Sequence, residues 1–225
     1  MTIHIFLADD HAVVRDGLRF ILGTQADMKV VGEAANGRQA VEKVIQLKPD
    51  VVVMDISMPQ LNGIEATREI RRSGPSTHVV ILSMHSSKEH IFRAFQAGTL
   101  GYILKECVDE EVVIAIRAVH AGRRYLCQSL TETVIDEFVI QKDTGAIRSP
   151  LDRLSSRERE ILQLVVEGKT SASIAEMLFL SPKTVETYRS RLMEKLGVSN
   201  LPELVKFAIE HGLTSISIKW NSEKR

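Results

Sequence analysis

Short apolar runs alternate with amphipathic segments over the first half of the chain. Apolar runs bounded by turn residues predict buried strands, and apolar residues spaced by three or four predict helices. The predicted strands cover residues 3–8, 28–34, 51–54, 78–83 and 101–104, and the predicted helices cover 13–23, 37–47, 64–72, 88–97 and 109–121. Strands that alternate with helices favour a parallel sheet with helices on both faces. Residues 1–121 are therefore predicted to form one doubly wound α/β domain.

The pattern changes after residue 121. Residues 128–141 keep a helical spacing of apolar residues, whereas 142–150 have no periodicity and end in Ser149-Pro150. A segment without periodicity that is punctuated by glycine and proline is typical of a flexible joint. Residues 122–149 are therefore predicted to be a linker helix followed by a hinge.

The last third of the chain carries only helical spacing. Ser155 and Glu158 are spaced as in a capping box ahead of an apolar helix, and Ser181-Pro182 is a favourable start for another helix. Further helices are predicted over 171–178, 182–196 and 202–211. This pattern predicts an all-α domain of four helices over 150–212, followed by a tail over 213–225.

The charge of the chain is balanced. Lys+Arg and Asp+Glu each total 29, so the formal net charge is zero. Neither half of the chain is basic overall. Bulk charge therefore does not indicate a nucleic-acid partner, and any such contact must come from a local patch.

Composition favours a cytoplasmic protein with no membrane partner. At 225 residues, with 44% hydrophobic and 26% charged content, the chain is long enough for two modest cores. No apolar stretch approaches the roughly 20 residues that cross a bilayer, and the N-terminus lacks the basic segment of a signal peptide. Cys107 and Cys127 form no recognised spacing motif, which favours reduced thiols, with a redox role as the alternative.

Polar side chains stand where the predicted strands end. Asp9 and Asp10 follow the first strand, Asp55 follows the third, Ser83 ends the fourth and Lys105 follows the fifth. Open α/β sheets bind ligands at the carboxyl ends of their strands. Converging carboxylates need a cation, and oxygen ligands favour Mg²⁺. A carboxylate can also attack phosphorus, and a lysine can hold phosphoryl oxygens. The sequence therefore predicts an acidic site that handles phosphate.

Each of these residues has a simpler interpretation when it is taken singly. Asp9-Asp10 can serve as turn residues or a helix cap, Asp55 can open a turn, and Lys105 can be a solvated surface lysine. Their joint placement at strand ends favours the shared site.

Three separated segments carry a family resemblance. Residues 7–11 (LADDH), 53–59 (VMDISMP) with Asn62-Gly63, and 97–105 (AGTLGYILK) resemble the receiver domain of two-component response regulators. The resemblance covers 1–121 and implies a flavodoxin-like sheet with strand order 2-1-3-4-5. It implies that Asp55 accepts a phosphoryl group from a histidine kinase or a small phosphodonor.

The same resemblance implies the other roles at this site. Asp9, Asp10, Asp55 and the main-chain carbonyl of Ser57 would hold Mg²⁺, and Ser83, Tyr102 and Lys105 would sense the phosphoryl group, with Tyr102 swinging inward. A phosphatase of the haloacid dehalogenase type is the alternative. Such phosphatases usually carry an acid two residues after the nucleophile, where this chain has Ser57. An enzyme is therefore not expected, beyond slow self-phosphorylation from small donors and self-dephosphorylation.

The segment 182–196 has one apolar and one polar face on a helical wheel. Val185, Tyr188, Leu192 and Leu196 share the core side, and the polar side carries hydroxyl and basic side chains. Such a face suits a helix that reads the DNA major groove. An ordinary amphipathic surface helix is the alternative.

A second resemblance covers residues 150–212. Residues 154–162 (LSSREREIL), 174–178 (IAEML), 181–188 (SPKTVETY) and 195–198 (KLGV) resemble the four-helix LuxR-type helix-turn-helix domain. The whole chain thus resembles a NarL/FixJ-type response regulator. The resemblance implies that 182–196 is the recognition helix. It implies phosphate contacts from Lys183, Thr184, Tyr188 and Arg191, and base contacts from Glu186, Thr187 and Ser190.

The expected function follows from both resemblances. Phosphorylation of Asp55 would promote dimerisation, in part through 202–211, and binding to an inverted repeat in promoter DNA, with RNA polymerase as a further candidate partner. Two departures bear on the DNA target: 170–173 (TSAS) stands where the family often has a Lys-Glu pair, and Tyr188 stands where histidine is usual. A phosphorylation-dependent protein-binding adaptor is the alternative.

Overall fold

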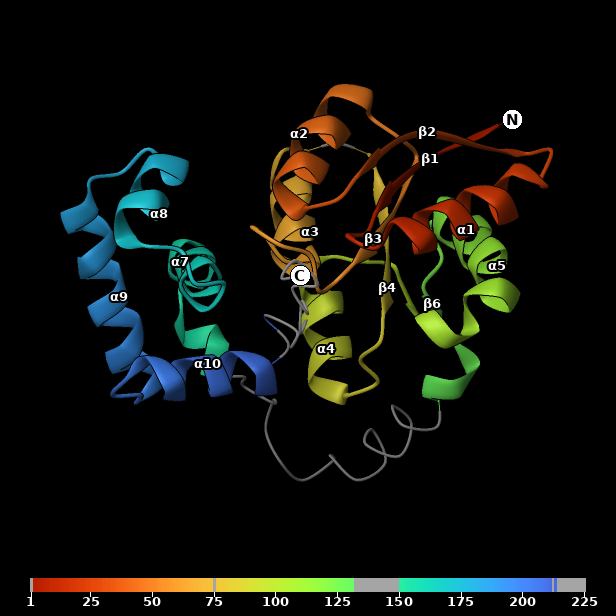
Figure 1. The fold of residues 1–225 in the computed structure, drawn as a ribbon. Helices are drawn as coiled ribbons and strands as arrows, with labels where there is room; N and C mark the ends of the chain where they lie inside the picture. Colours follow the sequence, from red (N-terminus) through yellow and green to blue (C-terminus); the bar gives the residue numbers. More distant parts are fainter. Residues whose placement is uncertain (1, 75, 132–149, 212, 214–225) are drawn as a thin grey trace, which may run out of the picture.

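The computed structural model describes residues 2–74, 76–131, 150–211 and 213, which form two regions that pack side by side (Figure 1). The first region contains a parallel sheet in the order β2-β1-β3-β4-β5-β6. Its strands are β1 (Ile3–Ala8), β2 (Met28–Ala34), β3 (Val51–Asp55), β4 (His78–Ser83), β5 (Gly101–Leu104) and β6 (Tyr125–Leu126). Its helices are α1 (Ala12–Gly23), α2 (Gly37–Leu47), α3 (Gly63–Arg72), α4 (Lys88–Ala97) and α5 (Val108–His120).

Helices cover both faces of this sheet. Helices α1 and α5 lie on one face, and α2, α3 and α4 lie on the other (Figure 1). The central strands are consequently buried along their whole length, as β3 shows, and their sequences are continuously apolar instead of alternating. The predicted doubly wound fold and the strand order 2-1-3-4-5 are confirmed.

The structure adds one strand that the pattern did not predict. The two-residue strand β6 pairs with β5, and the N–H of Cys127 extends the ladder by donating to the carbonyl of Tyr102 at 3.1 Å. A run of two residues is too short to show a period. The predicted linker helix is helical over residues 128–131, and its remainder, with the hinge, lies outside the described residues.

The second region is helical throughout its described part. It contains a short 3₁₀ helix, η3 (Pro150–Arg153), and the helices α7 (Ser156–Val166), α8 (Ser171–Leu178), α9 (Pro182–Leu196) and α10 (Leu201–Glu210). The predicted capping box is present, because the Ser155 hydroxyl accepts from the Glu158 N–H and the Glu158 carboxylate accepts from the Ser155 N–H. Within the described residues, no helix is long and apolar enough to cross a membrane.

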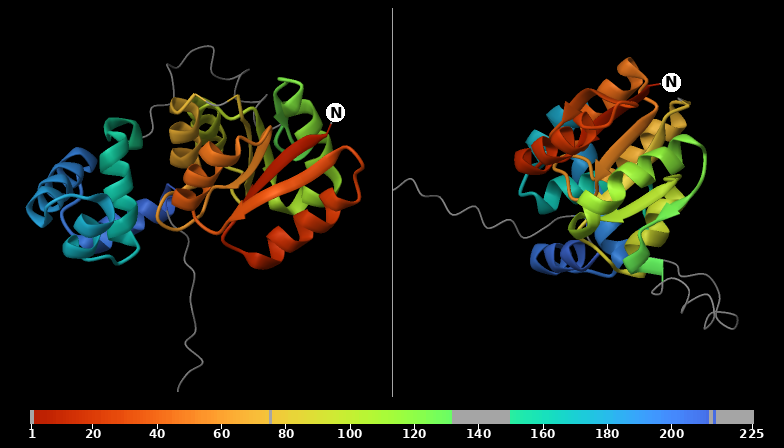
Figure 2. Two further views of the ribbon diagram at one scale, coloured as in Figure 1. Left: turned by 90° about the horizontal axis from the view of Figure 1, so that it is seen from above. Right: turned by 90° about the vertical axis from the view of Figure 1, so that its right-hand side faces the viewer.

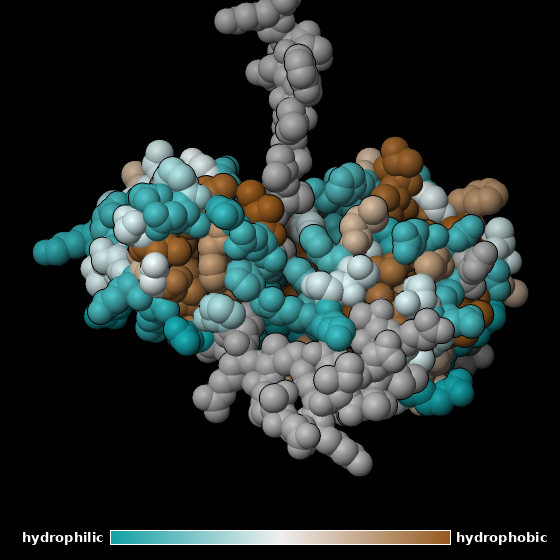
Figure 3. All heavy atoms as spheres, turned by 90° about the horizontal axis from the view of Figure 1, so that it is seen from below, coloured by the Kyte–Doolittle hydropathy of each residue, from teal (hydrophilic) through white to brown (hydrophobic). Residues whose placement is uncertain are grey.

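The two regions meet through specific elements. Helix α7 faces helices α2 and α3 of the first region, and the end of α10 approaches α4 (Figures 1 and 2). Helix α9 lies on the opposite side of the helical region, away from the sheet (Figure 1). Seen from below, apolar side chains gather on the underside of the helical region, where α10 lies (Figure 3).

Candidate functional site

Three predicted residues meet at the carboxyl edge of the sheet. Asp9 follows β1, Asp55 ends β3 and Lys105 follows β5, and both carboxylates are buried. The Lys105 ammonium lies 2.7 Å from Asp9 Oδ2 and 3.2 Å from Asp55 Oδ2. Parallel strands bring these side chains together because their carboxyl ends share one edge. One ammonium therefore lies between two buried acids.

The site has more negative than positive charge. Burial, together with the charges of Asp9 and Asp10, raises the pKa of Asp55 to about 6, although the nearby Lys105 lowers it. Burial alone would lower the pKa of Lys105, but Asp55 and Asp9 outweigh burial and raise it. A divalent cation would relieve this excess of charge.

The donor set is compatible with such a cation. Asp9, Asp10, His11 and Asp55 each offer a ligand atom, and these atoms all lie within 4.8 Å of one another. Three of the four donors are carboxylates, the ligands that Mg²⁺ prefers. His11 Nδ1 lies 2.8 Å from Asp10 Oδ1 and 3.2 Å from Asp9 Oδ1. Sequence analysis assigned His11 no role, and its position directly after the two acids was the only signal.

The predicted sensing residues are held around one loop residue, His85. The backbone N–H of His85 donates to the Ser83 hydroxyl at 3.0 Å, and the Tyr102 hydroxyl donates to the His85 carbonyl at 2.7 Å. The His85 ring lies 3.2 Å from the Ser57 hydroxyl. Tyr102 is already buried, and burial raises its pKa. The role of Tyr102 in sensing the phosphoryl group, with its inward swing, stays a prediction.

Helix α9 displays the predicted DNA-contacting residues. Val185 and Leu192 are buried, whereas Lys183, Glu186, Thr187, Ser190 and Arg191 are exposed and Thr184 and Tyr188 are half-buried. A shallow groove along the helix is lined by Ser181, Lys183, Thr184, Thr187, Tyr188 and Arg191. Five of the seven predicted residues thus share one surface.

Glu186 differs from the other predicted DNA contacts. Its carboxylate accepts a hydrogen bond from the Ser171 hydroxyl and lies 3.4 Å from Arg189. These partners, which sequence analysis did not connect with α9, fix Glu186 against the start of α8. Its assignment to a base contact stays a prediction.

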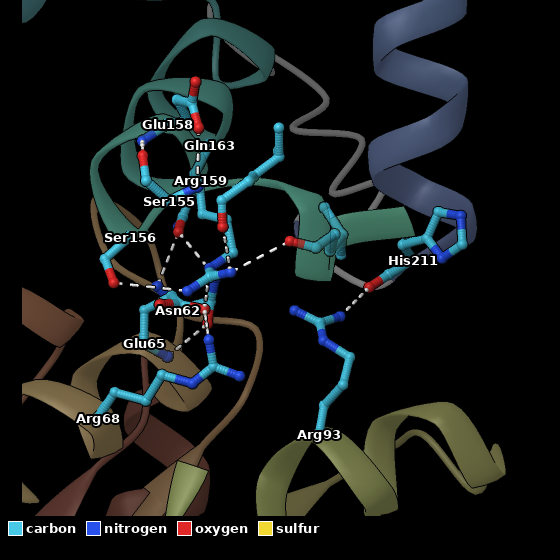
Figure 4. A network of polar contacts seen from close by, with 12 residues as sticks. Asn62, Glu65, Arg68, Arg93, Ser155, Ser156, Glu158, Arg159, Gln163 and His211 are labelled. Atoms are coloured by element: carbon cyan, nitrogen blue, oxygen red, sulfur yellow. Dashed lines mark hydrogen bonds and ion pairs between the residues drawn. The ribbon is translucent and has the colours of Figure 1, made fainter. Parts of the chain in front are cut away.

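A polar interface between the two regions was not predicted. The Gln163 side chain on α7 accepts from the Asn62 backbone N–H at 2.7 Å (Figure 4). It also donates to the Met58 carbonyl at 2.9 Å. The Gln60 N–H donates to the Glu167 carboxylate at 2.9 Å. These bonds hold the loop that follows Asp55 and contains Ser57.

Charged residues extend this interface. Arg159 on α7 pairs with Glu65 at 2.8 Å, and Arg38 pairs with Glu160. Arg93 on α4 donates to the His211 carbonyl at 3.0 Å (Figure 4). A single sequence offers no signal for such pairs, because their members are polar residues on different domains.

Two family models match the chain. The model described as the response regulator receiver domain matches residues 5–117, and the model described as bacterial regulatory proteins of the luxR family matches residues 152–208. The oxygen regulatory protein NreC of Staphylococcus aureus is 45% identical over 212 residues, which is 93% of this chain and 98% of that protein.

Solved structures agree with these matches. A LuxR-family two-component response regulator from Aurantimonas is 37% identical with a TM-score of 0.60, covering 62% of this chain and 99% of that chain. The response regulator RcsB, solved in complex with DNA, is 26% identical with a TM-score of 0.57, covering 92% of this chain and 98% of that chain.

Proposed function

We propose that Asp55 is the phosphoacceptor of this chain, which belongs to the NarL/FixJ-type two-component response regulators and is a DNA-binding regulator of transcription. The observation that carries the proposal is the ammonium of Lys105 between the buried carboxylates of Asp9 and Asp55. Above pH 6 the Asp55 carboxylate is mostly ionised. Its oxygen attacks the phosphorus of a phosphohistidine or of acetyl phosphate, and the imidazole or acetate leaves.

The surrounding residues position this transfer. Asp9, Asp10, Asp55 and the Ser57 carbonyl would hold Mg²⁺, which would supply positive charge to the incoming phosphoryl oxygens. Lys105 would hold the phosphoryl oxygens. Exposed Val13 and Met84 give the rim of the site an apolar character, which suits docking of a sensor histidine kinase.

Two contacts carry the signal away from the site. The Ser83 hydroxyl now accepts from the His85 N–H, and its own proton is available to a phosphoryl oxygen on Asp55. The loop that follows Ser57 is held by Gln163 and Glu167 of α7. A phosphoryl group that moves this loop therefore changes how the two domains dock.

Helix α9 faces away from the receiver domain in the docked arrangement (Figure 1). The docked receiver domain therefore leaves the recognition helix uncovered. For this reason we assign control of DNA binding to dimerisation. The apolar strip on α10 (Leu201, Pro202, Val205 and Ile209) would pair with its copy in a second chain. Two α9 helices related by a two-fold axis fit an inverted repeat, and the doubled phosphate contacts compensate for a neutral chain.

The phosphoacceptor is tested by the intact mass of the protein after treatment with acetyl phosphate and Mg²⁺. Wild type is expected to gain one phosphoryl group and Asp55→Asn none. Asp16→Asn is the matched control, because Asp16 is an exposed acid on the neighbouring helix α1. Equal phosphorylation of wild type and Asp55→Asn contradicts the proposal, and so does multiple-turnover hydrolysis of small phosphoesters.

A further inference from the structure

The two cysteines of the chain contact the same hydroxyl group, that of Ser129. Cys107 Sγ is 3.7 Å from Ser129 Oγ, and Cys127 Sγ is 3.4 Å from the same oxygen. Adjacent strands bring them together: Cys107 follows β5 through a short 3₁₀ turn, and Cys127 directly follows β6. Both thiols are free. Sequence spacing gave no sign of this pair, because the very short strand β6 creates it.

The two thiols have different surroundings. Cys127 is fully buried in the receiver core, whereas Cys107 is half-buried. Cys107 is also the N-cap residue of α5, and a helix N-terminus favours nearby negative charge. A half-exposed thiol beside a buried second thiol is the arrangement of a peroxide-reactive cysteine with its resolving partner.

We propose that Cys107 and Cys127 form an oxidisable dithiol that closes to an intrachain disulfide with hydrogen peroxide as the oxidant. The Cys107 thiolate attacks the peroxide O–O bond, which gives a sulfenic acid and releases hydroxide. The Cys127 sulfur then attacks the Cys107 sulfur and displaces its hydroxyl as water. Two thiols lose two electrons and two protons, and one peroxide becomes two waters.

Ser129 is expected to respond when the bond forms. Sulfur atoms in a disulfide lie about 2.05 Å apart, so bond formation replaces the contacts that both sulfurs make with the Ser129 hydroxyl. Ser129 belongs to the helical segment 128–131 that begins the linker helix, and Cys107 stands two residues after Lys105. The disulfide would therefore tie the segment after the phosphate-binding lysine to the start of the linker.

The test treats the full-length, reduced chain with hydrogen peroxide and maps its peptides without reductant. Wild type is expected to yield one linked pair, Cys107 with Cys127, that dithiothreitol reverses. Cys127→Ser is expected to stop at a sulfenic acid on Cys107 that dimedone traps. Cys107→Ser is expected to leave Cys127 reduced, because that thiol is buried. Circular dichroism checks that each variant is folded.

A second variant keeps the test decisive if Cys127→Ser does not fold. Ser129→Ala retains both thiols and removes the hydroxyl that contacts both of them, so disulfide formation is expected to be several-fold faster than in wild type. Oxidation of wild-type Cys107 to a sulfinic acid while Cys127 stays reduced overturns the proposal. Disulfides between chains, with none inside a chain, overturn it as well.

Discussion

The acidic pocket and the domain interface use the same loop of the receiver but satisfy their polar groups in opposite ways. In the pocket, one ammonium serves the buried carboxylates of Asp9 and Asp55, and the pKa of Asp55 rises to about 6. In the interface, Gln163 meets both an N–H and a carbonyl of the loop. The pocket thus leaves a carboxylate oxygen of Asp9 and of Asp55 without a hydrogen-bond partner and is ready for a ligand, whereas Gln163 satisfies the loop groups that it meets. Because the pocket and the interface share this loop, a ligand bound in the pocket can disturb the interface.

The largest effect on stability is expected from Asp55→Asn. Because the pKa of Asp55 is about 6 in the folded protein and 3.8 in the unfolded chain, the folded state binds this proton more tightly. The stabilisation is complete below pH 3.8 and is lost as the pH rises through 6. An asparagine at position 55 cannot ionise, so Asp55→Asn avoids the stability that wild type loses when Asp55 ionises. The variant should therefore be more stable than wild type at neutral pH by about 3 kcal/mol at most.

Thermal unfolding across this pH range measures the difference. The extra stability of Asp55→Asn over wild type should vanish in acid. It should also shrink when Mg²⁺ is added, because the cation stabilises wild type by binding its folded state. Asp16→Asn, which changes an exposed acid, should follow wild type at every pH. A gain for Asp55→Asn that does not depend on pH would contradict an unsatisfied pocket.

Gln163→Ala should weaken the interface by about 1–3 kcal/mol, because it leaves the buried Asn62 N–H and Met58 carbonyl without their partner. Faster amide hydrogen exchange in residues 58–62 and in α7 would report the loss. Gln46→Ala is the matched control, since Gln46 is an exposed helical glutamine on α2. Unchanged exchange in Gln163→Ala would show that the loop is held by other contacts.

Lys183→Ala should lower DNA affinity through the loss of about one phosphate contact and reduce the slope of log affinity against log salt by about 1. Fluorescence anisotropy with a promoter fragment at several salt concentrations measures both quantities. Lys29→Ala, at an exposed position on β2, should leave the slope unchanged. An unchanged slope for Lys183→Ala would remove this residue from the DNA interface.

The smallest effect is expected from Arg72→Ala. Arg72 is exposed and donates to the Ser156 hydroxyl at 3.1 Å, and exposed polar pairs contribute about 0–1 kcal/mol. Hydrogen exchange in α7 should stay within error of wild type. A loss as large as that of Gln163→Ala would show that exposed contacts also hold the domains together, and the contrast drawn above would fail.

The pocket could be predicted from the sequence because its residues follow strands whose apolar runs are visible. Asp9, Asp55 and Lys105 needed only the rule that parallel strands end at one edge. Gln163 could not be found in this way, because its partners are backbone atoms more than a hundred positions away. The Cys107–Cys127 pair was hidden because β6 has only two residues. Local periodicity thus predicts the core and the residues at the strand ends. Contacts between polar surfaces become visible only in the folded structure.

Control of DNA binding by phosphorylation of Asp55 is tested most directly by sedimentation and promoter-fragment binding, measured together with and without acetyl phosphate and Mg²⁺. Wild type should dimerise and bind DNA more tightly only when it is phosphorylated, and Asp55→Asn should do neither. Equal DNA binding by both proteins, with or without the phosphodonor, would contradict the account and leave the DNA-binding domain independent of its receiver.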